Sequence, residues 1–296
     1  MQNITVIGSG TMGNGIAHVC ALYGYKVVLV DIKQNLLDKA LATIEKNLTR
    51  QVQKNVITAD QKIQTLQNIS IDILLASGVK NADLVIEAVS ENPEIKEKIY
   101  RELDEVCPPH TILASNTSSI SITQLAAYTQ RPQQVIGMHF MNPVPMMKLV
   151  EVICGYNTDK EVTAKVMQLA KDLGKEPVAV NDYPGFVANR ILMPMINEAI
   201  NTLYEGVAGV HEIDTVMRLG MAHPMGPLRL ADFIGLDVCL SILQVMHEGL
   251  GRLHYAPCPL LIKMVTAGKL GVKSGEGFYN YADPSKPEIS SRFVKC

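Results

Sequence analysis

One segment near the amino terminus constrains the fold of this 296-residue chain more than any other. Residues 4–7 form a short apolar run that predicts a buried strand, and Gly8-Ser9-Gly10-Thr11-Met12-Gly13 follows it directly. A helical pattern comes next, then a second apolar strand at Lys26–Val30, with Asp31 at its end. A βαβ unit that binds a dinucleotide typically has these parts in this order: a strand, a glycine turn, a helix, a second strand and an acidic residue at its end.

Each glycine of this turn has a physical role in such a unit. Gly8 allows a tight turn, Gly10 lets the backbone approach a pyrophosphate, and Gly13 permits close packing of helix and strand. The helix N-terminus favours the negative charge of the phosphates, and Asp31 can hydrogen-bond ribose hydroxyls. The alternative is a plain βαβ turn with an incidental acid. The agreement of all five parts favours the dinucleotide.

Composition narrows the class of protein. The length suggests two domains, and 47% hydrophobic residues with a net charge of −2 fit a soluble globular enzyme rather than a nucleic-acid binder. The six cysteines are scattered without a CxxC, which predicts small buried hydrophobes in a reducing compartment. No basic leader region precedes the first strand and no apolar run is long enough to span a bilayer, so we expect a cytoplasmic protein without membrane contact.

Alternating strands and helices continue to about residue 183. We expect strands at 69–72, 84–88, 111–115, 135–140, 148–153 and 177–180, and helices at 33–54, from Asp60 as N-cap, from Pro93, at 122–128 and at 160–173. This alternation predicts a doubly wound, mostly parallel, Rossmann-type α/β sheet over residues 1–183.

Pro184-Gly185 marks the expected domain boundary. The apolar positions beyond it recur at helical spacing, which predicts an all-helical domain over residues 184–296. We expect helices at 186–204 with a kink at Pro194, at 211–219, 228–250 and 260–267, and a glycine-rich turn at 273–279.

Polar side chains follow the carboxyl ends of two expected strands. Asn116 and Ser118 follow one strand and His139 closes the next. Ligands of parallel sheets bind at this edge, and histidine is suited to proton transfer near neutral pH. His223, in the helical domain, is the main rival, whereas His18 and the others are expected to be structural or solvated.

Glu151 interrupts the apolar run of the next strand. A carboxylate there is costly unless it is paired, so we expect it to orient His139 and stabilise its imidazolium. The alternative is a strand end at which Glu151 faces solvent or a lysine. Asn189 lies early in the first helix after the boundary, where it can either hydrogen-bond a substrate or occupy an ordinary helix surface.

Three basic residues are candidate anion contacts. Arg50, Lys54 and Lys96 could bind phosphates, although a solvated basic helix face explains any one of them as well. The histidines and cysteines lack the spacing of metal ligands, so no metal site is expected. The glycine turn lacks a following Gly-Lys-Ser/Thr and is not a P-loop.

Four motifs together resemble one known family. Ser115–Ser119, Gly137–Pro143, Lys148–Val152 and Pro184–Arg190 are similar to the signatures of L-3-hydroxyacyl-CoA dehydrogenases. The resemblance runs from the glycine turn to Gly275–Tyr279 and is greatest to the short bacterial 3-hydroxybutyryl-CoA dehydrogenases. Met141, where a second aromatic is common, and Pro93 depart from the pattern without removing a functional group.

The resemblance implies a role for each matching residue. His139 matches the general acid/base and Glu151 its orienting partner, while Ser118 and Asn189 match groups that hold the substrate. The cofactor-contacting positions are implied to be Gly8, Gly10, Thr11, Met12, Gly13, Asp31, Glu91, Lys96, Asn116 and Asn142. Arg50, Lys54 and Lys96 match basic positions that serve the substrate, the first two near the CoA phosphates.

The activity implied by the resemblance is hydride transfer between (S)-3-hydroxyacyl-CoA and NAD, with a short acyl chain and a homodimer or higher homo-oligomer. Asp31 favours NAD, and Lys33 nearby could tolerate NADP as a minor cofactor. Two alternatives remain. One is a β-hydroxyacid dehydrogenase acting on a free acid, and the other is a non-catalytic NAD-binding relative.

Overall fold

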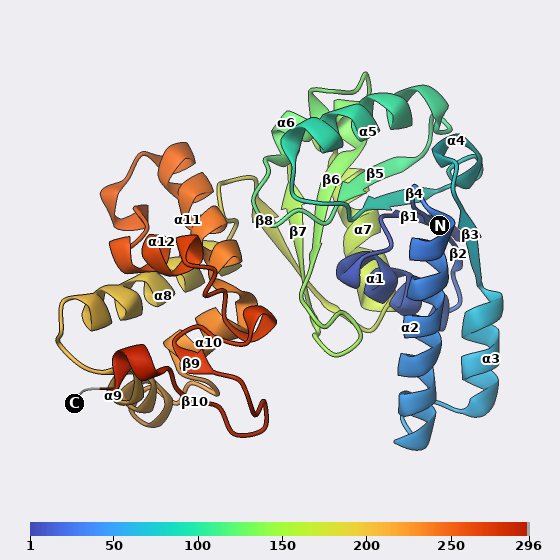
Figure 1. Cartoon of the computed structure of the whole chain (residues 1–296). Helices are drawn as coiled ribbons and strands as arrows, with labels where there is room; N and C mark the ends of the chain where they lie inside the picture. The colour runs from blue at the N-terminus through green and yellow to red at the C-terminus, as the bar shows by residue number, and fades with distance from the viewer. Residues whose placement is uncertain (295–296) are drawn as a thin grey trace. The chain divides into compact units, whose positions relative to one another are not determined.

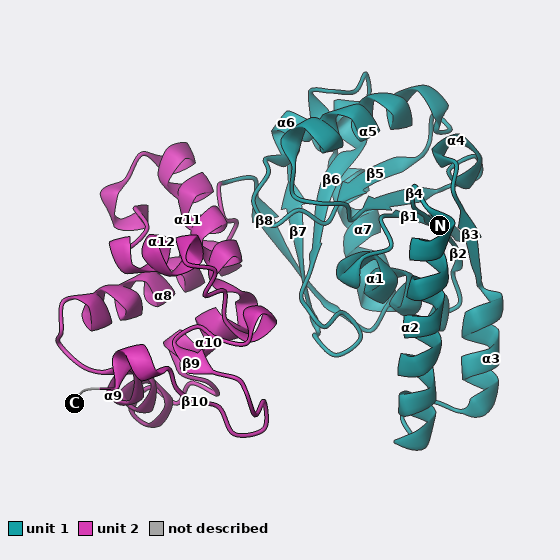
Figure 2. Ribbon diagram, viewed as in Figure 1, with its two compact units in different colours: residues 1–183 teal, residues 184–296 magenta. Residues whose placement is uncertain are grey.

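The computed structural model describes residues 1–294, and the chain divides into two compact units, residues 1–183 and 184–296 (Figure 2). The first unit is built on one eight-stranded sheet with the order β3-β2-β1-β4-β5-β6-β7-β8. Every neighbouring pair is parallel except β6 and β7, which run antiparallel. The strands are β1 (Asn3–Ile7), β2 (Lys26–Val30), β3 (Ile69–Asp72), β4 (Leu84–Glu87), β5 (Ile112–Ser115), β6 (Val135–Phe140), β7 (Leu149–Cys154) and β8 (Glu176–Asn181). The predicted mostly parallel sheet is confirmed.

Helices cover both faces of this sheet (Figure 1). They are α1 (Thr11–Leu22), α2 (Gln34–Gln53), α3 (Ala59–Gln67), α4 (Leu75–Gly78), α5 (Pro93–Val106), α6 (Ile122–Ala126) and α7 (Lys160–Asp172). The apolar stripe of α2 is buried against the core at Leu37, Ala40, Ile44 and Leu48, which recur at helical spacing. All positions of β4 and β5 are buried, as a sheet covered on both sides requires.

The second unit is helical. It contains α8 (Ala188–Tyr204), α9 (Val210–Thr215), a π-helical turn at Val216–Gly220, α10 (Pro227–Ile234), α11 (Leu236–Leu250) and α12 (Pro259–Thr266). A short antiparallel pair, β9 (Tyr279–Asn280) and β10 (Glu288–Ile289), is the one departure from the all-helical expectation within the described residues. Pro194 lies inside α8.

Two predicted boundaries are wrong and one short helix was not predicted, each for an identifiable reason. The helix expected from Asp60 is capped by Thr58 instead, because Thr58 and Gln61 form a reciprocal capping box. The helix expected at 228–250 is broken at Gly235, whose φ of 105° ends α10. The short α4 after β3 was not expected, since its four residues are too few to give a periodic pattern.

The described cysteines agree with the prediction that most of them are small buried residues. Cys20, Cys107, Cys239 and Cys258 are buried, Cys154 is partly buried, and all five are free thiols. The sixth, Cys296, lies outside the described residues. Over residues 1–294, none of the helices combines the length and the apolar character needed to cross a membrane.

A buried carboxylate anchors the carboxy-terminal segment on α10. Asp232 is fully buried and accepts hydrogen bonds from the backbone N–H groups of Phe278 and Tyr279 and from the hydroxyl of Tyr281. Burial raises the pKa of Asp232 to about 6, although these three donors act in the opposite direction. A proton is therefore bound more tightly in the folded chain than in the unfolded one.

We expect the free energy of unfolding of the native chain, relative to an Asp232→Asn variant, to fall by up to about 3 kcal/mol as the pH rises from about 4 to about 6. The raised pKa means that this stabilisation is complete below the ordinary value of 3.8 and is lost as the pH passes the folded pKa. Chemical unfolding followed by circular dichroism at several pH values measures it. Asp283→Asn, at an exposed carboxylate, is the control. A difference that stays constant with pH would contradict the expectation.

Candidate active site

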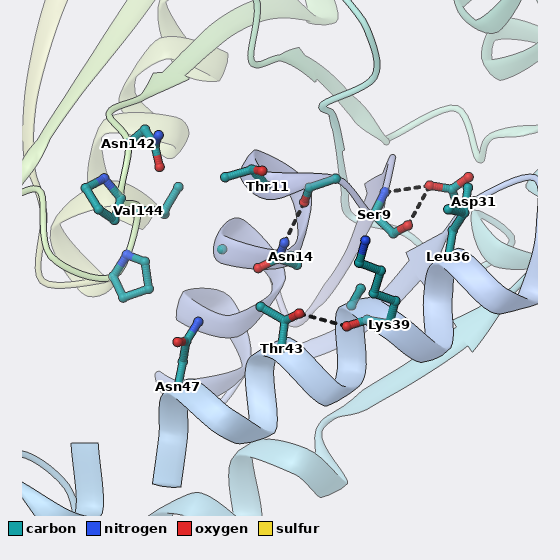
Figure 3. Close-up of a pocket in the computed structure, with 15 residues that line it drawn as sticks. Ser9, Thr11, Asn14, Asp31, Leu36, Lys39, Thr43, Asn47, Asn142 and Val144 are labelled. Carbon is teal, nitrogen blue, oxygen red and sulfur yellow. Dashed lines mark hydrogen bonds between the residues drawn. The ribbon is translucent and has the colours of Figure 1, made fainter. Parts of the chain in front are cut away.

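The glycine turn forms one wall of a cavity of about 500 Å³ at the carboxyl ends of β1 and β2 (Figure 3). Gly8 has a φ of 94°, and a Cβ on Gly13 would lie 1.7 Å from the carbonyl oxygen of Gly8. No atom lies within 4 Å of a Cβ built on Gly10. The turn therefore needs glycine at Gly8 and Gly13 for its own geometry and leaves open space at Gly10, where a pyrophosphate can approach.

Asp31 is fixed beside the glycine turn, where it lines the same cavity. Its Oδ2 accepts hydrogen bonds from the backbone N–H of Ser9 at 2.7 Å and from the Ser9 hydroxyl at 2.6 Å. Its Oδ1 accepts the backbone N–H of Ile32. The carboxylate is thus held at the end of β2, the strand end at which dinucleotide-binding folds carry the acid that meets the ribose. These residues fit a dinucleotide cofactor.

The side of α2 that faces the cavity was not predicted to contribute to it. Lys39, Thr43 and Asn47 line it, and Lys39 is the single basic residue among its lining residues. Lys33, which the sequence suggested as the cation near the ribose, caps α2, is exposed and is not part of the lining. Helical spacing along α2 was the available signal, because residues 36, 40, 43 and 47 share one face.

The other residues expected to contact the cofactor differ in position. Thr11 and Asn142 line the cavity, whereas the side chain of Met12 packs against the core. The side-chain oxygen of Asn116 accepts the backbone N–H of Phe140 at 2.9 Å, which ties the loop after β5 to β6.

His139 and Glu151 form a buried pair. The antiparallel register of β6 and β7 places the two residues directly opposite each other. His139 Nδ1 lies 2.8 Å from Glu151 Oε2, with side-chain exposures of 8% and 3%. The predicted pairing is therefore present, and the alternative of a solvent-facing Glu151 is wrong. With the carboxylate as acceptor, Nδ1 carries the proton and Nε2 is left to face the reacting group.

Ser118 meets the other nitrogen of the ring. Its Oγ lies 3.1 Å from His139 Nε2, so serine, histidine and glutamate form a line across the ends of β5, β6 and β7. An imidazole that a carboxylate orients through Nδ1, with a hydroxyl beside Nε2, can take a proton from an alcohol and return it.

The remaining histidines and Asn189 are placed as follows. His18 is fully buried in α1, and burial lowers its pKa to about 4, so it is a neutral core residue as expected. His223 and Asn189 belong to the second unit, in which Asn189 is buried in the first turn of α8.

Lys96 is not the exposed cation that the sequence suggested. Its side chain is fully buried, and its ammonium lies 2.7 and 2.8 Å from the two carboxylate oxygens of Glu87, which is also fully buried. The hypothesis of a solvated helix face is therefore wrong for this side chain. Glu91 lies 3.6 Å from the same ammonium.

Arg50 and Lys54 lie at the carboxyl end of α2 and are exposed. Positions 43, 47, 50 and 54 fall on one face of the helix, so both cations continue the face that lines the cavity. Neither makes an ion pair with any other residue in the described range 1–294. Within that same range, no cluster of histidine, cysteine or carboxylate side chains could hold a metal ion.

Comparison with known proteins covers nearly the whole chain. Residues 3–183 match the family model of the 3-hydroxyacyl-CoA dehydrogenase NAD binding domain, and residues 185–281 match that of the 3-hydroxyacyl-CoA dehydrogenase C-terminal domain. A probable 3-hydroxybutyryl-CoA dehydrogenase of Bacillus subtilis is 54% identical over 96% of this chain and 98% of its own length. The 3-hydroxybutyryl-CoA dehydrogenase of Clostridioides difficile is 50% identical over 95% of this chain and 99% of its own. The crystal structure of (S)-3-hydroxybutyryl-CoA dehydrogenase from Ralstonia eutropha aligns with a TM-score of 0.93 at 47% identity, covering 96% of this chain and all of that one.

We expect Lys96→Met to lower the free energy of unfolding by about 3–5 kcal/mol, because it leaves Glu87 buried without a counter-charge. Chemical unfolding at neutral pH measures the change. Lys98→Met, at an exposed position on the same helix, is the matched control and should change stability by less than about 0.5 kcal/mol. Equal effects of the two substitutions would mean that Lys96 does not hold Glu87 in the folded protein.

Proposed function

The chain belongs to the 3-hydroxyacyl-CoA dehydrogenase family, and on that basis we propose that it interconverts (S)-3-hydroxybutyryl-CoA and acetoacetyl-CoA with NAD(H). It is an NAD-dependent oxidoreductase. The observation that carries the assignment of the chemistry is the hydrogen bond between His139 and Glu151 at the end of the sheet. Relatives named for the four-carbon thioester support the short acyl chain.

A bound NAD, held at the glycine turn and Asp31, would supply the acceptor for the hydride of C3. His139 accepts the proton of the 3-hydroxyl at Nε2 as the C3 carbonyl forms, and in the reductive direction it returns that proton. Glu151 keeps the ring in the tautomer that carries its proton at Nδ1, and it stabilises the imidazolium once the proton has arrived at Nε2. The negative charge of this buried carboxylate lies 2.8 Å from Nδ1 and favours the protonated ring.

Ser118 and Asn189 are proposed to hold the reacting oxygen. For Ser118 the proposal is supported by its hydroxyl beside His139 Nε2. For Asn189 it is supported by the position of this residue in the motif Pro184–Arg190. A hydrogen-bond donor at that oxygen stabilises the negative charge that develops on it during proton transfer.

Arg50 and Lys54 are proposed to attract the phosphates of CoA. Their place on the cavity-facing side of α2, one and two turns beyond Asn47, supports this role. On the cofactor side, Asp31 is proposed to select NAD, because its carboxylate would repel a 2′-phosphate. Lys39 is the one basic residue among those that line the cavity with Asp31. The minor use of NADP is therefore proposed to depend on Lys39 rather than on Lys33.

We further propose a homodimer formed through the helical unit, and a cytoplasmic location. Several large apolar side chains of this unit are more than half exposed, namely Val207, Val216, Leu219 and Met221. Val216 also lines a largely apolar cavity of about 370 Å³, together with residues of α8, α9 and Pro227. Exposed apolar surface of this kind favours a protein interface.

The direct test is turnover of acetoacetyl-CoA with NADH by the purified chain and by His139→Ala. The variant should lose activity on the order of 100- to 10,000-fold, the usual contribution of a general acid/base, and should still bind NADH. His110→Ala, at an exposed histidine, is the control. Near-normal turnover by a folded His139→Ala variant would exclude His139 as the catalyst. Reduction of free acetoacetate in place of the thioester would favour the free-acid alternative, and no turnover of either would favour the non-catalytic relative.

The phosphate contacts have their own test. Replacing Arg50 and Lys54 together by alanine should raise the KM for acetoacetyl-CoA roughly two- to thirtyfold, since each exposed ion pair contributes about 0.2–1 kcal/mol. The KM for a truncated acetoacetyl thioester without the nucleotide should not change. Lys98→Ala, at an exposed lysine on α5, is the control. Equal increases for both substrates would indicate that the two cations do not meet the CoA phosphates.

A further inference from the structure

The segment that carries Ser118 is held by a single carboxylate oxygen. Oε1 of Glu91 accepts four hydrogen bonds, from the Thr117 hydroxyl at 2.5 Å and from the Ser118 N–H, the Ser119 N–H and the Ser119 hydroxyl at 2.9 Å each. The Thr117 hydroxyl in turn accepts the backbone N–H groups of Ser119 and Ile120. Four donors on one charged oxygen define the path of the backbone on both sides of Ser118.

Glu91 also contacts the buried ion pair formed by Lys96 and Glu87. Its second oxygen, Oε2, lies 3.6 Å from the Lys96 ammonium, which is held between the two oxygens of Glu87. Glu87 also accepts the hydroxyl of Ser115, the last residue of β5. Lys96 therefore links the end of β4, the end of β5 and the carboxylate that holds the serine segment.

The charge of Glu91 is stabilised in the folded protein. Burial alone would raise the pKa of this carboxyl, but Lys96 and the hydrogen bonds from Thr117, Ser119 and Ser118 outweigh that effect and hold the pKa below its ordinary value. The carboxylate is thus ionised at neutral pH. Its side chain is 36% exposed, so it is not sealed within the core.

We propose that Glu91 is a positioning residue for the reaction, whose carboxylate holds residues 117–119 so that Ser118 Oγ lies against His139 Nε2. This inference rests on the proposed function, since it assigns Glu91 a role through Ser118 and His139. It differs from the cofactor contact implied by the family resemblance, because a cofactor contact requires no hydrogen bond between Glu91 and the serine segment.

The chemistry explains why a carboxylate is needed. Glutamine at this position would keep one acceptor oxygen but would lose the charge that strengthens four hydrogen bonds. Its amide NH₂ would also face the Lys96 ammonium, donor against donor, and would push the side chain away from its present place. A displacement of Ser118 by a fraction of an ångström alters the 3.1 Å contact with His139, and such misplacements can reduce rates up to about 100-fold.

The test is a double-mutant cycle with acetoacetyl-CoA and NADH. We expect Glu91→Gln to lower kcat about 10- to 100-fold while the KM for NADH changes less than about threefold. In a Ser118→Ala background the same substitution should lower kcat by no more than about twofold, because the group it positions is absent. Glu94→Gln, on the exposed first turn of the same helix, is the control and should leave kcat unchanged.

Two outcomes would overturn the proposal. One is an equal loss of kcat in the native and Ser118→Ala backgrounds, and the other is an effect confined to the KM for NADH, which would assign Glu91 to the cofactor alone. Circular dichroism and thermal unfolding check the fold of each variant. If Glu91→Gln does not fold, Glu91→Asp, which keeps the charge on a shorter arm, takes its place in the cycle with the same expectations. The proposed function would fail by a different result, no turnover of acetoacetyl-CoA by the native chain, which separates the two failures.

Discussion

The antiparallel pairing of β6 and β7 is the constraint on which the candidate active site depends. Each of the other six strand pairs is parallel, and a parallel β7 would require a crossover connection rather than the short loop of residues 141–148. The reversal puts His139 opposite Glu151 and buries both side chains at the edge where the strands end. Burial removes the carboxylate from water, and its hydrogen bond to the imidazole offsets part of the desolvation free energy. The same bond fixes which nitrogen of the ring can take a proton.

A buried ion pair lies next to the row formed by Ser118, His139 and Glu151, and it is connected to the segment that carries Ser118. The pair of Lys96 and Glu87 has no exposed surface, and it is joined to Glu91 and Ser115. A buried ion pair is a weak source of stability, since desolvation offsets most of the attraction, but it is specific in geometry because either partner alone would be strongly destabilising. Such a pair suits a site whose loops must keep one conformation. The loops after β4 and β5 meet on it, and the serine that contacts His139 stands on the second of them.

Helix α2 carries residues proposed to serve both ligands, the dinucleotide cofactor and the CoA ester. Its buried stripe secures it to the sheet, and the adjacent face first lines the cofactor cavity and then presents two exposed cations. A rigid helix of 20 residues is about 30 Å long, which is enough to serve the adenosine of one ligand and the phosphates of another. In the helical unit a buried carboxylate, Asp232, joins α10 to the backbone of Phe278 and Tyr279.

The sequence alone determined the glycine turn with Asp31, the order of the strands in the first unit, the mostly parallel sheet and the pairing of His139 with Glu151. Local spacing and strand-end geometry carry that information within short stretches of chain. The tertiary structure decided what depends on contacts between distant segments. In the sequence Lys96 is indistinguishable from an exposed cation on a helix. It is a buried counter-ion because the fold brings it against Glu87, which lies nine residues earlier on another element. The role of Glu91 depends on donors 26 to 28 residues further along. Lys39 likewise faces the cavity because of the rotation at which α2 packs, which the buried stripe fixes only once the sheet is formed.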